Sequence, residues 1–396
     1  MDIKLSNRIK KVKPSSTLAV AAKAAELRAE GKDIVGLGTG EPDFDTPDFI
    51  KQAAIIAIEN GATKYTAVDG TASLKQAIIS KFNKDNQLDY QAKQILVSSG
   101  GKQSFFNLCQ ALLNQGDEVI IPAPYWVSYP DMVLLADGNP VIIDTHIDNQ
   151  LKITPAQLEA AITDRTRLFV INSPSNPTGV AYDLSELQAL ATVLLKYPHV
   201  LIATDDMYEH IIWTENAFVN ILNACPELYQ RTIVLNGVSK AYAMTGWRIG
   251  YAAGPAELIA AMKKVQSQST SNPASISQAA AEAALTGDQS CVKTMLLEFK
   301  KRHDYVVKEL NQIDGIRCLQ SDGTFYAFPD VSELIEKVGC KSDSDFAEYL
   351  LEKVGLALVP GSAFGAQGHL RLSYAASMET LKDALSRLRQ AADLEG

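Results

Sequence analysis

The chain has 396 residues, with 46 acidic and 37 basic side chains and a formal net charge of −9. This length suits two or three domains, and a composition of 46% hydrophobic and 21% charged residues excludes a disordered chain. No apolar run approaches the ~20 residues of a membrane-spanning helix, and the net negative charge argues against a nucleic-acid binder that works by bulk charge. We therefore expect neither a membrane nor a nucleic-acid partner.

The five cysteines and five histidines show no spacing typical of a metal site. The odd number of cysteines also argues against a disulfide framework, so we expect no metal and a reducing, cytoplasmic location. The N-terminal stretch is basic, but no apolar segment follows it. We expect an exposed helical arm there rather than a secretory signal or a transit peptide.

Seven short runs rich in Val and Ile occupy the middle of the chain, with few alternating polar positions. They are Ile95–Ser98, Glu118–Pro122, Pro140–Asp144, Leu168–Ser173, Val200–Thr204, Thr232–Asn236 and Ile249–Ala253. Such runs are typical of strands buried on both faces, and hence of a mostly parallel sheet. Helical patterns separate several of them, at Gln103–Leu113, Thr154–Ala161 and Leu184–Leu195. The pattern predicts an α/β domain with a seven-stranded sheet between helices.

The C-terminal part of the chain has a different pattern, in which a long charged helical stretch precedes short strands flanked by two helices. These segments are Ser290–Gln312, then Gly323–Phe328, Ala357–Pro360 and His369–Tyr374, with helices at Ser344–Lys353 and Met378–Ala392. This order is typical of a smaller α+β domain. We therefore expect an N-terminal arm that contributes to the small domain (1–45), a large domain (46–288) and a small C-terminal domain (289–396).

Several motifs directly follow predicted strands, at the edge where open α/β sheets bind ligands. The segment Ser98–Gln103 contains Gly100 and Gly101 and opens a helix, where free amides attract phosphate, although a tight turn alone would also explain it. The loop Ser173–Gly179 holds Asn176 between two prolines, which would fix the direction of its amide. An ordinary turn is the simpler interpretation of that loop.

Two further motifs carry titratable groups. Asp205 ends an apolar strand, where its carboxylate can accept a hydrogen bond from a protonated ring nitrogen. The simpler interpretation is that Asp205 or Asp206 caps the next helix. Lys240 follows the next strand in a Gly-flanked apolar stretch, and Arg248 lies eight residues further on. A desolvated lysine has a lowered pKa and forms Schiff bases with carbonyls, and an arginine binds phosphate. The simpler interpretation of Lys240 is a side chain that reaches the surface.

In combination, a phosphate cradle, a directed Asn, an Asp at a strand end with Tyr208 three residues on, and a Lys with a trailing Arg are the parts that hold pyridoxal phosphate. The chain resembles the class I, fold-type-I pyridoxal-phosphate aminotransferases over nearly its whole length. The most specific motifs are Asn172–Gly179 and Ser239–Tyr251. More narrowly, it resembles the bacterial aspartate aminotransferases that include bifunctional aspartate/prephenate enzymes, since these tolerate Gly237 where the animal and enterobacterial types carry serine.

The resemblance implies a role for each matching residue. Lys240 would bind the cofactor covalently and move the substrate proton, Asp205 would pair with the ring nitrogen, and Tyr208 with Asn176 would hydrogen-bond the phenolic oxygen. The other cofactor contacts that it implies are Trp126 against the ring and Gly100, Gly101, Lys102, Ser239 and Arg248 around the phosphate.

The same resemblance implies the substrate contacts and the assembly. Arg371 would bind the substrate α-carboxylate, assisted by Gly40, Asn176 and Trp126. Tyr65 resembles the tyrosine that reaches the phosphate of the neighbouring subunit, which implies a homodimer with shared active sites.

A dicarboxylate substrate needs two cationic contacts, because an unpaired carboxylate loses its water without compensation. The resemblance to the subgroup implies that Lys102 binds the distal carboxylate. The simpler interpretation is that Lys102 is a solvated residue in the first turn of a helix. Thr17 matches a threonine that accompanies acceptance of prephenate, and Lys13 lies nearby in sequence.

We therefore expect small-molecule amino acids and 2-oxo acids as ligands, amino transfer between aspartate and 2-oxoglutarate as the reaction, and prephenate as a second acceptor. The alternatives are an aromatic or broad-specificity aminotransferase and a pyridoxal-phosphate-dependent lyase. A transcriptional regulator on the same fold is not expected, because the first 45 residues show no basic winged-helix pattern.

Overall fold

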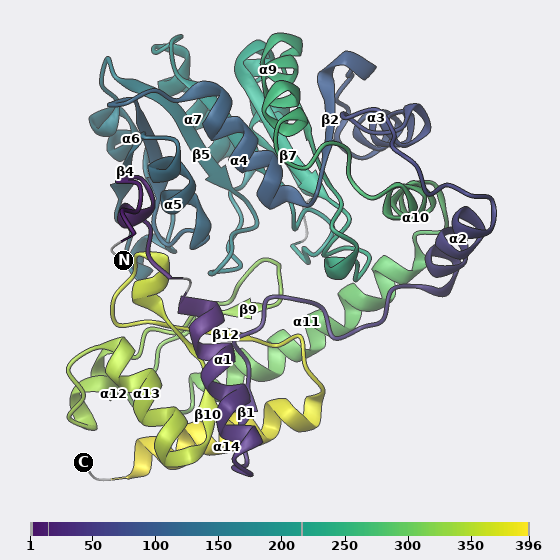
Figure 1. The fold of residues 1–396 in the computed structure, drawn as a ribbon. Helices are drawn as coiled ribbons and strands as arrows, with labels where there is room; N and C mark the ends of the chain where they lie inside the picture. The colour runs from purple at the N-terminus through teal and green to yellow at the C-terminus, as the bar shows by residue number, and fades with distance from the viewer. Residues whose placement is uncertain (1–2, 15, 215–216, 395–396) are drawn as a thin grey trace.

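The structure is a computed structural model that describes residues 3–14, 16–214 and 217–394 (Figure 1). Its largest sheet has the strand order β2-β8-β7-β6-β5-β3-β4. These strands are β2 (Ile95–Ser98), β3 (Glu118–Pro122), β4 (Asn139–Ile143), β5 (Thr166–Asn172), β6 (Leu201–Asp205), β7 (Thr232–Gly237) and β8 (Gly250–Ala253). The pairs of β8 with β2 and with β7 are antiparallel, and the other strand pairs of this sheet are parallel. The prediction of a mostly parallel, seven-stranded sheet is confirmed.

Both faces of this sheet are covered, as the apolar runs predict. Ile95 and Val97 belong to one buried apolar cluster, whereas Leu96 between them belongs to another, because successive side chains of a strand point to opposite faces. The first cluster is closed by α3 (Ala72–Asn86), α6 (Pro155–Ala161), α7 (Leu184–Leu195), α8 (Ile221–Ala224) and α10 (Ser275–Thr286). The second is closed by α4 (Gly101–Leu112), α5 (Ser128–Leu135) and α9 (Ala256–Ser267).

The edge strand β4 departs from the expected burial. Asn139 is exposed, and Ile142 keeps 36% of its surface accessible. Pairing with β3 on one side only leaves this strand at the rim of the sheet. Burial on both faces is therefore wrong for β4, whereas the other edge strand, β2, is buried along its whole length.

A third apolar cluster forms the core of the lower part of the molecule in Figure 1. Its strands are short, and β11-β12-β9 form an antiparallel sheet. The strands and helices are α11 (Ser290–Leu310), β9 (Tyr326–Ala327), α12 (Ser332–Lys337), α13 (Asp343–Val354), β10 (Leu356–Ala357), β11 (Val359–Pro360), β12 (Leu370–Ser373) and α14 (Met378–Asp393). The α+β character predicted for this part is confirmed.

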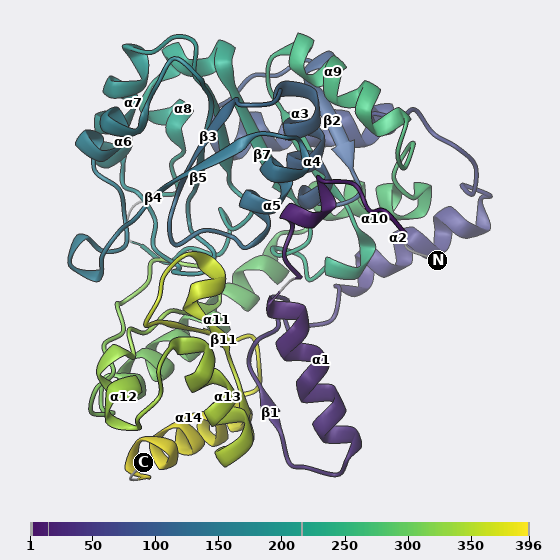
Figure 2. The same ribbon diagram turned by 60° about the vertical axis from the view of Figure 1, so that its left-hand side comes forward.

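The N-terminal segment divides between the two parts. The short helix η1 (Ile9–Lys11) lies against α5 (Figure 2), and the guanidinium of Arg8 is 2.9 Å from the carboxylate of Asp137. Beyond it, α1 (Ser16–Ala29) packs on the lower part, and β1 (Val35–Gly36) pairs in parallel with β10. Domain boundaries at residues 45 and 288 stay predictions.

Three further features of the described residues concern the cysteines, membrane-spanning helices and metal-binding groups. All five cysteines are free thiols in the structure. Within residues 3–14, 16–214 and 217–394, no helix is long and apolar enough to cross a membrane. Over the same residues, no group of three or more His, Cys, Asp or Glu side chains is placed to hold a metal ion.

Candidate active site

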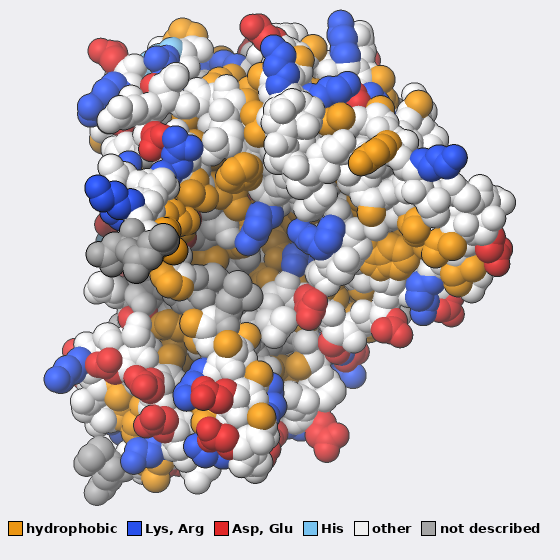
Figure 3. Space-filling view, in the orientation of Figure 1, with side chains coloured by type: hydrophobic (Ala, Val, Ile, Leu, Met, Phe, Trp, Pro, Cys, Tyr) orange, Lys and Arg blue, Asp and Glu red, His pale blue; other side chains and the backbone are white. Residues whose placement is uncertain are grey.

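A cavity of about 770 Å³ lies where the ends of the central strands meet the lower part of the molecule. Figure 3 shows this face hollowed between its upper and lower parts, with basic side chains beside the hollow. The predicted residues that line the cavity are Lys13, Thr17, Gly40, Gly101, Lys102, Trp126, Asn176, Asp205, Tyr208, Ser239, Lys240, Arg248 and Arg371. Gly100 lies directly beside this lining, whereas Tyr65 is 91% exposed and lies outside it.

The amine of Lys240 lies inside this cavity, just beyond the end of β7. Its Nζ donates a hydrogen bond to the carbonyl of Gly40 at 2.5 Å, and no carboxylate of the described residues lies within ion-pair distance. Burial, helped by the charge of Arg371, lowers the pKa of Lys240 to about 8. A substantial fraction of this amine is therefore neutral near pH 8, which is the form that attacks a carbonyl. The interpretation of Lys240 as a surface side chain is wrong.

Asp205 ends β6 with its carboxylate at the cavity. The hydroxyl of Tyr129 donates to Oδ2 at 2.5 Å, and the amide of Met207 donates to Oδ1 at 3.2 Å. Burial raises the pKa of Asp205, and these two hydrogen bonds oppose that rise. The carboxylate is thus held in one orientation as an acceptor for a proton donor in the cavity.

The neighbouring carboxylate of Asp206 points into the protein instead. It accepts hydrogen bonds from Thr204 Oγ1 at 2.6 Å and from Asn220 Nδ2 at 2.8 Å, and burial raises its pKa to about 7. The next helix, α8, is capped by Asn220. Helix capping by either aspartate is therefore wrong.

Arg371, from β12, is a buried cation without a carboxylate partner among the described residues. Its Nη1 donates to Asn176 Oδ1 at 3.0 Å and its Nη2 to the carbonyl of Gly38 at 2.7 Å, while its Nε has no hydrogen-bond partner there. The guanidinium also lies 4.5 Å from the ring centroid of Tyr326. A guanidinium with an open donor at a cavity is suited to a carboxylate, which it binds with two parallel hydrogen bonds.

Tyr208 and Asn176 are held beside this arginine. The hydroxyl of Tyr208 lies 3.0 Å from that of Tyr326, so the two phenols share a hydrogen bond. The main-chain amide of Asn176 donates to Asn172 Oδ1 at 2.8 Å. At Gly40, a Cβ atom would come within 2.7 Å of the Tyr326 hydroxyl, so only glycine allows this close approach.

The N-terminus of α4 forms the opposite end of the cavity. Gly100 precedes the helix with φ +89° and offers no capping side chain, so the first amides of the helix remain available. A Cβ at Gly100 would lie 2.1 Å from Arg248 Nη2, and a Cβ at Gly250 would lie 2.2 Å from the amide nitrogen of Gly101. The glycines thus bring free amides next to a guanidinium, with Ser239 at the same cavity, and this combination binds phosphate.

Two further groups face the cavity between these ends. The Nζ of Lys102 lies 5.1 Å from the ring centroid of Trp126, and burial and the charge of Arg248 lower its pKa. Lys102 is itself exposed at the wall of the cavity, so its contact with a substrate stays a prediction beside the simpler interpretation of a solvated residue. Thr17, from α1, has a buried hydroxyl that finds no partner in the described part of the chain, and the exposed Lys13 lines the same side.

Sequence reasoning missed two tyrosines that orient the predicted residues. Tyr129 holds Asp205, and Tyr326 contacts both Tyr208 and Arg371. No local pattern distinguishes these tyrosines from core residues, since both are at most 1% exposed. Asn172 was visible at the end of a strand motif, but its link to Asn176 follows only from the folded loop.

Comparison with known sequences shows the family. A sequence model described as aminotransferase class I and II matches residues 32–388. The aspartate/prephenate aminotransferase of Nitrosomonas europaea is 64% identical over 392 residues, which cover 98% of this chain and 99% of that protein. The protein of the same name from Cereibacter sphaeroides is 54% identical over 390 residues, which cover 97% and 98%.

Solved structures give the same result. The aspartate aminotransferase from Rhizobium meliloti superposes with a TM-score of 0.96 at 49% identity and covers 100% of both chains. That from Thermus thermophilus with maleate superposes with a TM-score of 0.93 at 41% identity, covering 98% of this chain and 100% of the other. The chain thus belongs to the class I and II aminotransferases, a family that generally depends on pyridoxal phosphate, and it has their fold-type-I architecture.

Proposed function

We propose that this aminotransferase uses pyridoxal phosphate to move an amino group between L-aspartate and 2-oxoglutarate, and that it accepts prephenate as a second oxo acid. The observation that carries this proposal is one cavity that holds the buried amine of Lys240, the carboxylate of Asp205 and the guanidinium of Arg371. The names of its relatives, aspartate/prephenate aminotransferase and aspartate aminotransferase, support the choice of substrates.

The residues present fit the cofactor. The main-chain amides at Gly100 and Gly101 would hold the phosphate together with Arg248 and Ser239. A Cβ atom at either glycine would fill the space beside these amides. Asp205 would accept a hydrogen bond from the protonated ring nitrogen. The remaining contacts would come from the Tyr208 hydroxyl and the Asn176 amide at the phenolic oxygen, and from the indole of Trp126 against the ring.

When bound, the cofactor's ring supplies an electron sink for the bonds of the substrate Cα. Lys240 would hold the cofactor through Nζ and, once free, would move the substrate proton between Cα and the cofactor's C4′. Asp205 keeps the ring nitrogen protonated, because its carboxylate is already aligned by Tyr129. Arg371 orients the substrate by its α-carboxylate, so that the Cα–H bond faces the amine.

The distal carboxylate of the substrate would be bound by Lys102. Its ammonium and the guanidinium of Arg371 line the same cavity, so the two cations offer one contact to each end of a dicarboxylate. The hydroxyl of Thr17, which has no partner among the described residues, and the amine of Lys13 would contact the larger prephenate.

The function is tested by assaying the purified protein, loaded with pyridoxal phosphate, with a panel of amino donors and oxo-acid acceptors. Aspartate and glutamate should be the best donors, and prephenate should be aminated. Reduction with borohydride should leave the cofactor attached to the peptide that contains Lys240. Preference for phenylalanine or tyrosine over aspartate would favour the aromatic alternative, and elimination without amino transfer would favour a lyase.

The active form is proposed to be a homodimer. Helix α2 (Asp48–Glu59) carries Ile56 and Ile58 with 53% and 52% of their surface exposed, and Figure 3 shows hydrophobic side chains gathered over this helix. Exposed apolar faces of this kind mark interaction surfaces. A second copy covering α2 would bring the exposed Tyr65 to the partner's phosphate site.

Hybrid dimers of Lys240→Ala and Tyr65→Phe subunits test this assembly. In a hybrid both lesions fall on one shared site, so the other site is intact and activity should exceed that of either parent. No gain after verified subunit exchange would mean that Tyr65 acts within its own subunit. The cytoplasmic location stays a prediction.

A further inference from the structure

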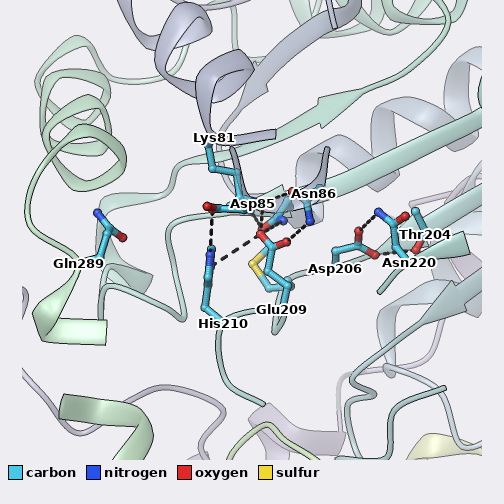
Figure 4. Close-up of polar contacts among 12 residues, drawn as sticks. Lys81, Asp85, Asn86, Thr204, Asp206, Glu209, His210, Asn220 and Gln289 are labelled. Atoms are coloured by element: carbon cyan, nitrogen blue, oxygen red, sulfur yellow. Dashed lines mark hydrogen bonds and ion pairs between the residues drawn. The ribbon is translucent and has the colours of Figure 1, made fainter. Parts of the chain in front are cut away.

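A second polar cluster lies behind the cavity, between the central sheet and α3. We call it the Glu209 cluster, and its members are Lys81, Asn86, Glu209 and Asn236. Lys81 and Glu209 form an ion pair in which each side chain is only 3% exposed. Figure 4 shows Lys81 and Asn86 of α3 directed at the carboxylate of Glu209, apart from the pair formed by Asp206 and Asn220.

Each oxygen of Glu209 has a defined donor. Asn236 Nδ2 donates to Oε1 at 2.7 Å, and Asn86 Nδ2 donates to Oε2 at 2.8 Å. Lys81 pairs with Oε1 and also donates to Asn86 Oδ1 at 2.7 Å. Burial alone would raise the pKa of Glu209, but the charges of Lys81 and His210 and these hydrogen bonds hold it below its ordinary value. The carboxylate is therefore ionised, and charged acceptors make the stronger hydrogen bonds.

The cluster joins two chain segments that carry the proposed cofactor contacts. Glu209 directly follows Tyr208 and comes four residues after Asp205. Asn236 lies in β7, four residues before Lys240, and its Oδ1 accepts a hydrogen bond from the amide of Gly237 at 2.7 Å. One carboxylate thus connects the segment beyond β6 with the segment beyond β7.

Stability alone does not account for this arrangement. Taking two charges out of water costs so much that buried ion pairs are often no more stabilising than apolar side chains of the same volume. The Lys152–Glu186 pair of the same part of the molecule, at 2.8 Å, lies half open to water, since the side chain of Glu186 is 37% exposed. The Glu209 cluster is buried where two segments of the active site meet, so a role in geometry is the stronger explanation.

We infer that Glu209 is a positioning residue, which holds the segment of Tyr208 and Asp205 in register with the segment of Lys240. The inference rests on the proposed function, since it assumes that these three residues contact the cofactor. Glu209 itself does not line the cavity. Glu209 acts on the Lys240 segment through its hydrogen bond with Asn236, and on the Tyr208 and Asp205 segment through the main chain. Lys81 and Asn86 of α3 hold the carboxylate of Glu209 in place.

The test compares two variants with a matched control. Glu209→Gln removes the charge but keeps the shape, and it leaves Lys81 unpaired. The double variant Lys81→Met/Glu209→Gln removes both charges, so that no uncompensated charge remains buried. The control Lys152→Met/Glu186→Gln removes an ion pair that lies outside the cavity lining.

Each holoenzyme is measured for the rate of cofactor loss on dilution, for kcat and KM with aspartate, and for Tm. Both Glu209 variants should lower kcat and speed cofactor loss by about tenfold or more, because displacements of about 1 Å at reacting groups have effects of that order. KM should change less than kcat, since Arg371 and Lys102 are untouched. The control should leave cofactor retention and kcat as in the wild type.

Wild-type kcat and cofactor retention in both Glu209 variants, with only Tm lowered, would overturn the inference. So would recovery of both in the double variant alone, because the unpaired charge of Lys81 would then be the cause. A wild-type protein that takes up no cofactor would refute the proposed function, and the inference with it, before any variant is compared.

Discussion

The active-site cavity has two walls that are built differently. On the sheet wall, Asp205, Asn176 and Lys240 follow the central strands, and each makes at least one hydrogen bond that fixes it. On the N-terminal wall, Lys13 is exposed and the hydroxyl of Thr17 has no partner among the described residues. Reacting groups must be held within a fraction of an ångström, whereas contacts with the far end of a substrate tolerate variation. We therefore expect the chemistry to depend on the sheet wall and substrate choice on the N-terminal wall.

The largest effect is expected at Lys240. On the proposed function, Lys240→Ala would remove both the covalent attachment and the proton carrier, so turnover should fall by about 10⁴-fold or more, at the upper end for a general acid–base group. Steady-state rates with aspartate measure this, and circular dichroism checks that the fold is kept. Residual turnover above a hundredth of wild type would mean that another amine serves the reaction.

The second effect concerns Asp205. Asp205→Ala should lower kcat by about 10²–10³-fold, as the loss of one preorganised electrostatic contact does, and it should shift the absorption of the bound cofactor. Asp205→Glu keeps the charge and should be milder. As a comparison, Tyr129→Phe leaves the carboxylate but removes its 2.5 Å donor and should cost less than Asp205→Ala. An effect on Tm alone would assign Asp205 to the fold.

A pH dependence is expected from Lys240 in the cofactor-free protein. Burial lowers its pKa from an ordinary value of 10.5 to about 8, so below pH 8 the folded protein carries a disfavoured charge. Between these two values the unfolded chain binds a proton that the folded chain does not, and this group's contribution to stability rises with pH. The rate of cofactor attachment should rise about tenfold per pH unit up to pH 8 and then level off. Stopped-flow absorbance measures that rate, and a midpoint near 10.5 would contradict the burial of the amine.

Lys102 lies between the two walls and should show a smaller, selective effect. If Lys102 binds the distal carboxylate, Lys102→Ala would remove one charge-assisted hydrogen bond, and KM for aspartate and glutamate should rise by roughly tenfold or more. KM for alanine and phenylalanine should change little, because these substrates have no distal charge. Lys93→Ala, at an exposed lysine outside the cavity, is the control. An equal loss for all donors would place Lys102 at the phosphate instead.

The smallest effect is expected on the N-terminal wall. Thr17→Val has nearly the same shape and breaks no hydrogen bond of the described residues, so Tm should be unchanged. The ratio of kcat/KM for prephenate to that for oxaloacetate should fall by about threefold to tenfold if the hydroxyl contacts the larger substrate. Measuring both acceptors with glutamate as donor gives this ratio. An unchanged ratio would leave Thr17 without a part in selection.

The predicted strands and helices agree with the structure to within about two residues in the upper part, because their signals are local. The helix α7 matches its predicted range Leu184–Leu195, and Asp183 with Glu186 forms the capping box that marks its start. The pairing of β1 with β10 was not predicted, since it joins Val35 to Leu356 and no short-range pattern records a contact between segments so far apart.

The site shows the same division. By itself, the sequence determined the strand ends and the motifs that carry Lys240, Asp205 and Asn176. These residues come at the ends of apolar runs, and strands that pair in parallel bring such ends to the same edge of the sheet. Their resemblance to a known family added the roles.

Only the tertiary structure decided which groups orient them and where glycine is required. Tyr129 and Tyr326 reach the site from other elements, and β7 meets β8 at Gly237 and Gly250. A Cβ at Gly237 would lie 3.0 Å from the Cα of Gly250, which in turn contacts the Gly101 turn, so a side chain there would crowd the cradle. Burial, hydrogen-bond partners and close approaches belong to pairs of segments, and a pair exists only once the chain has folded.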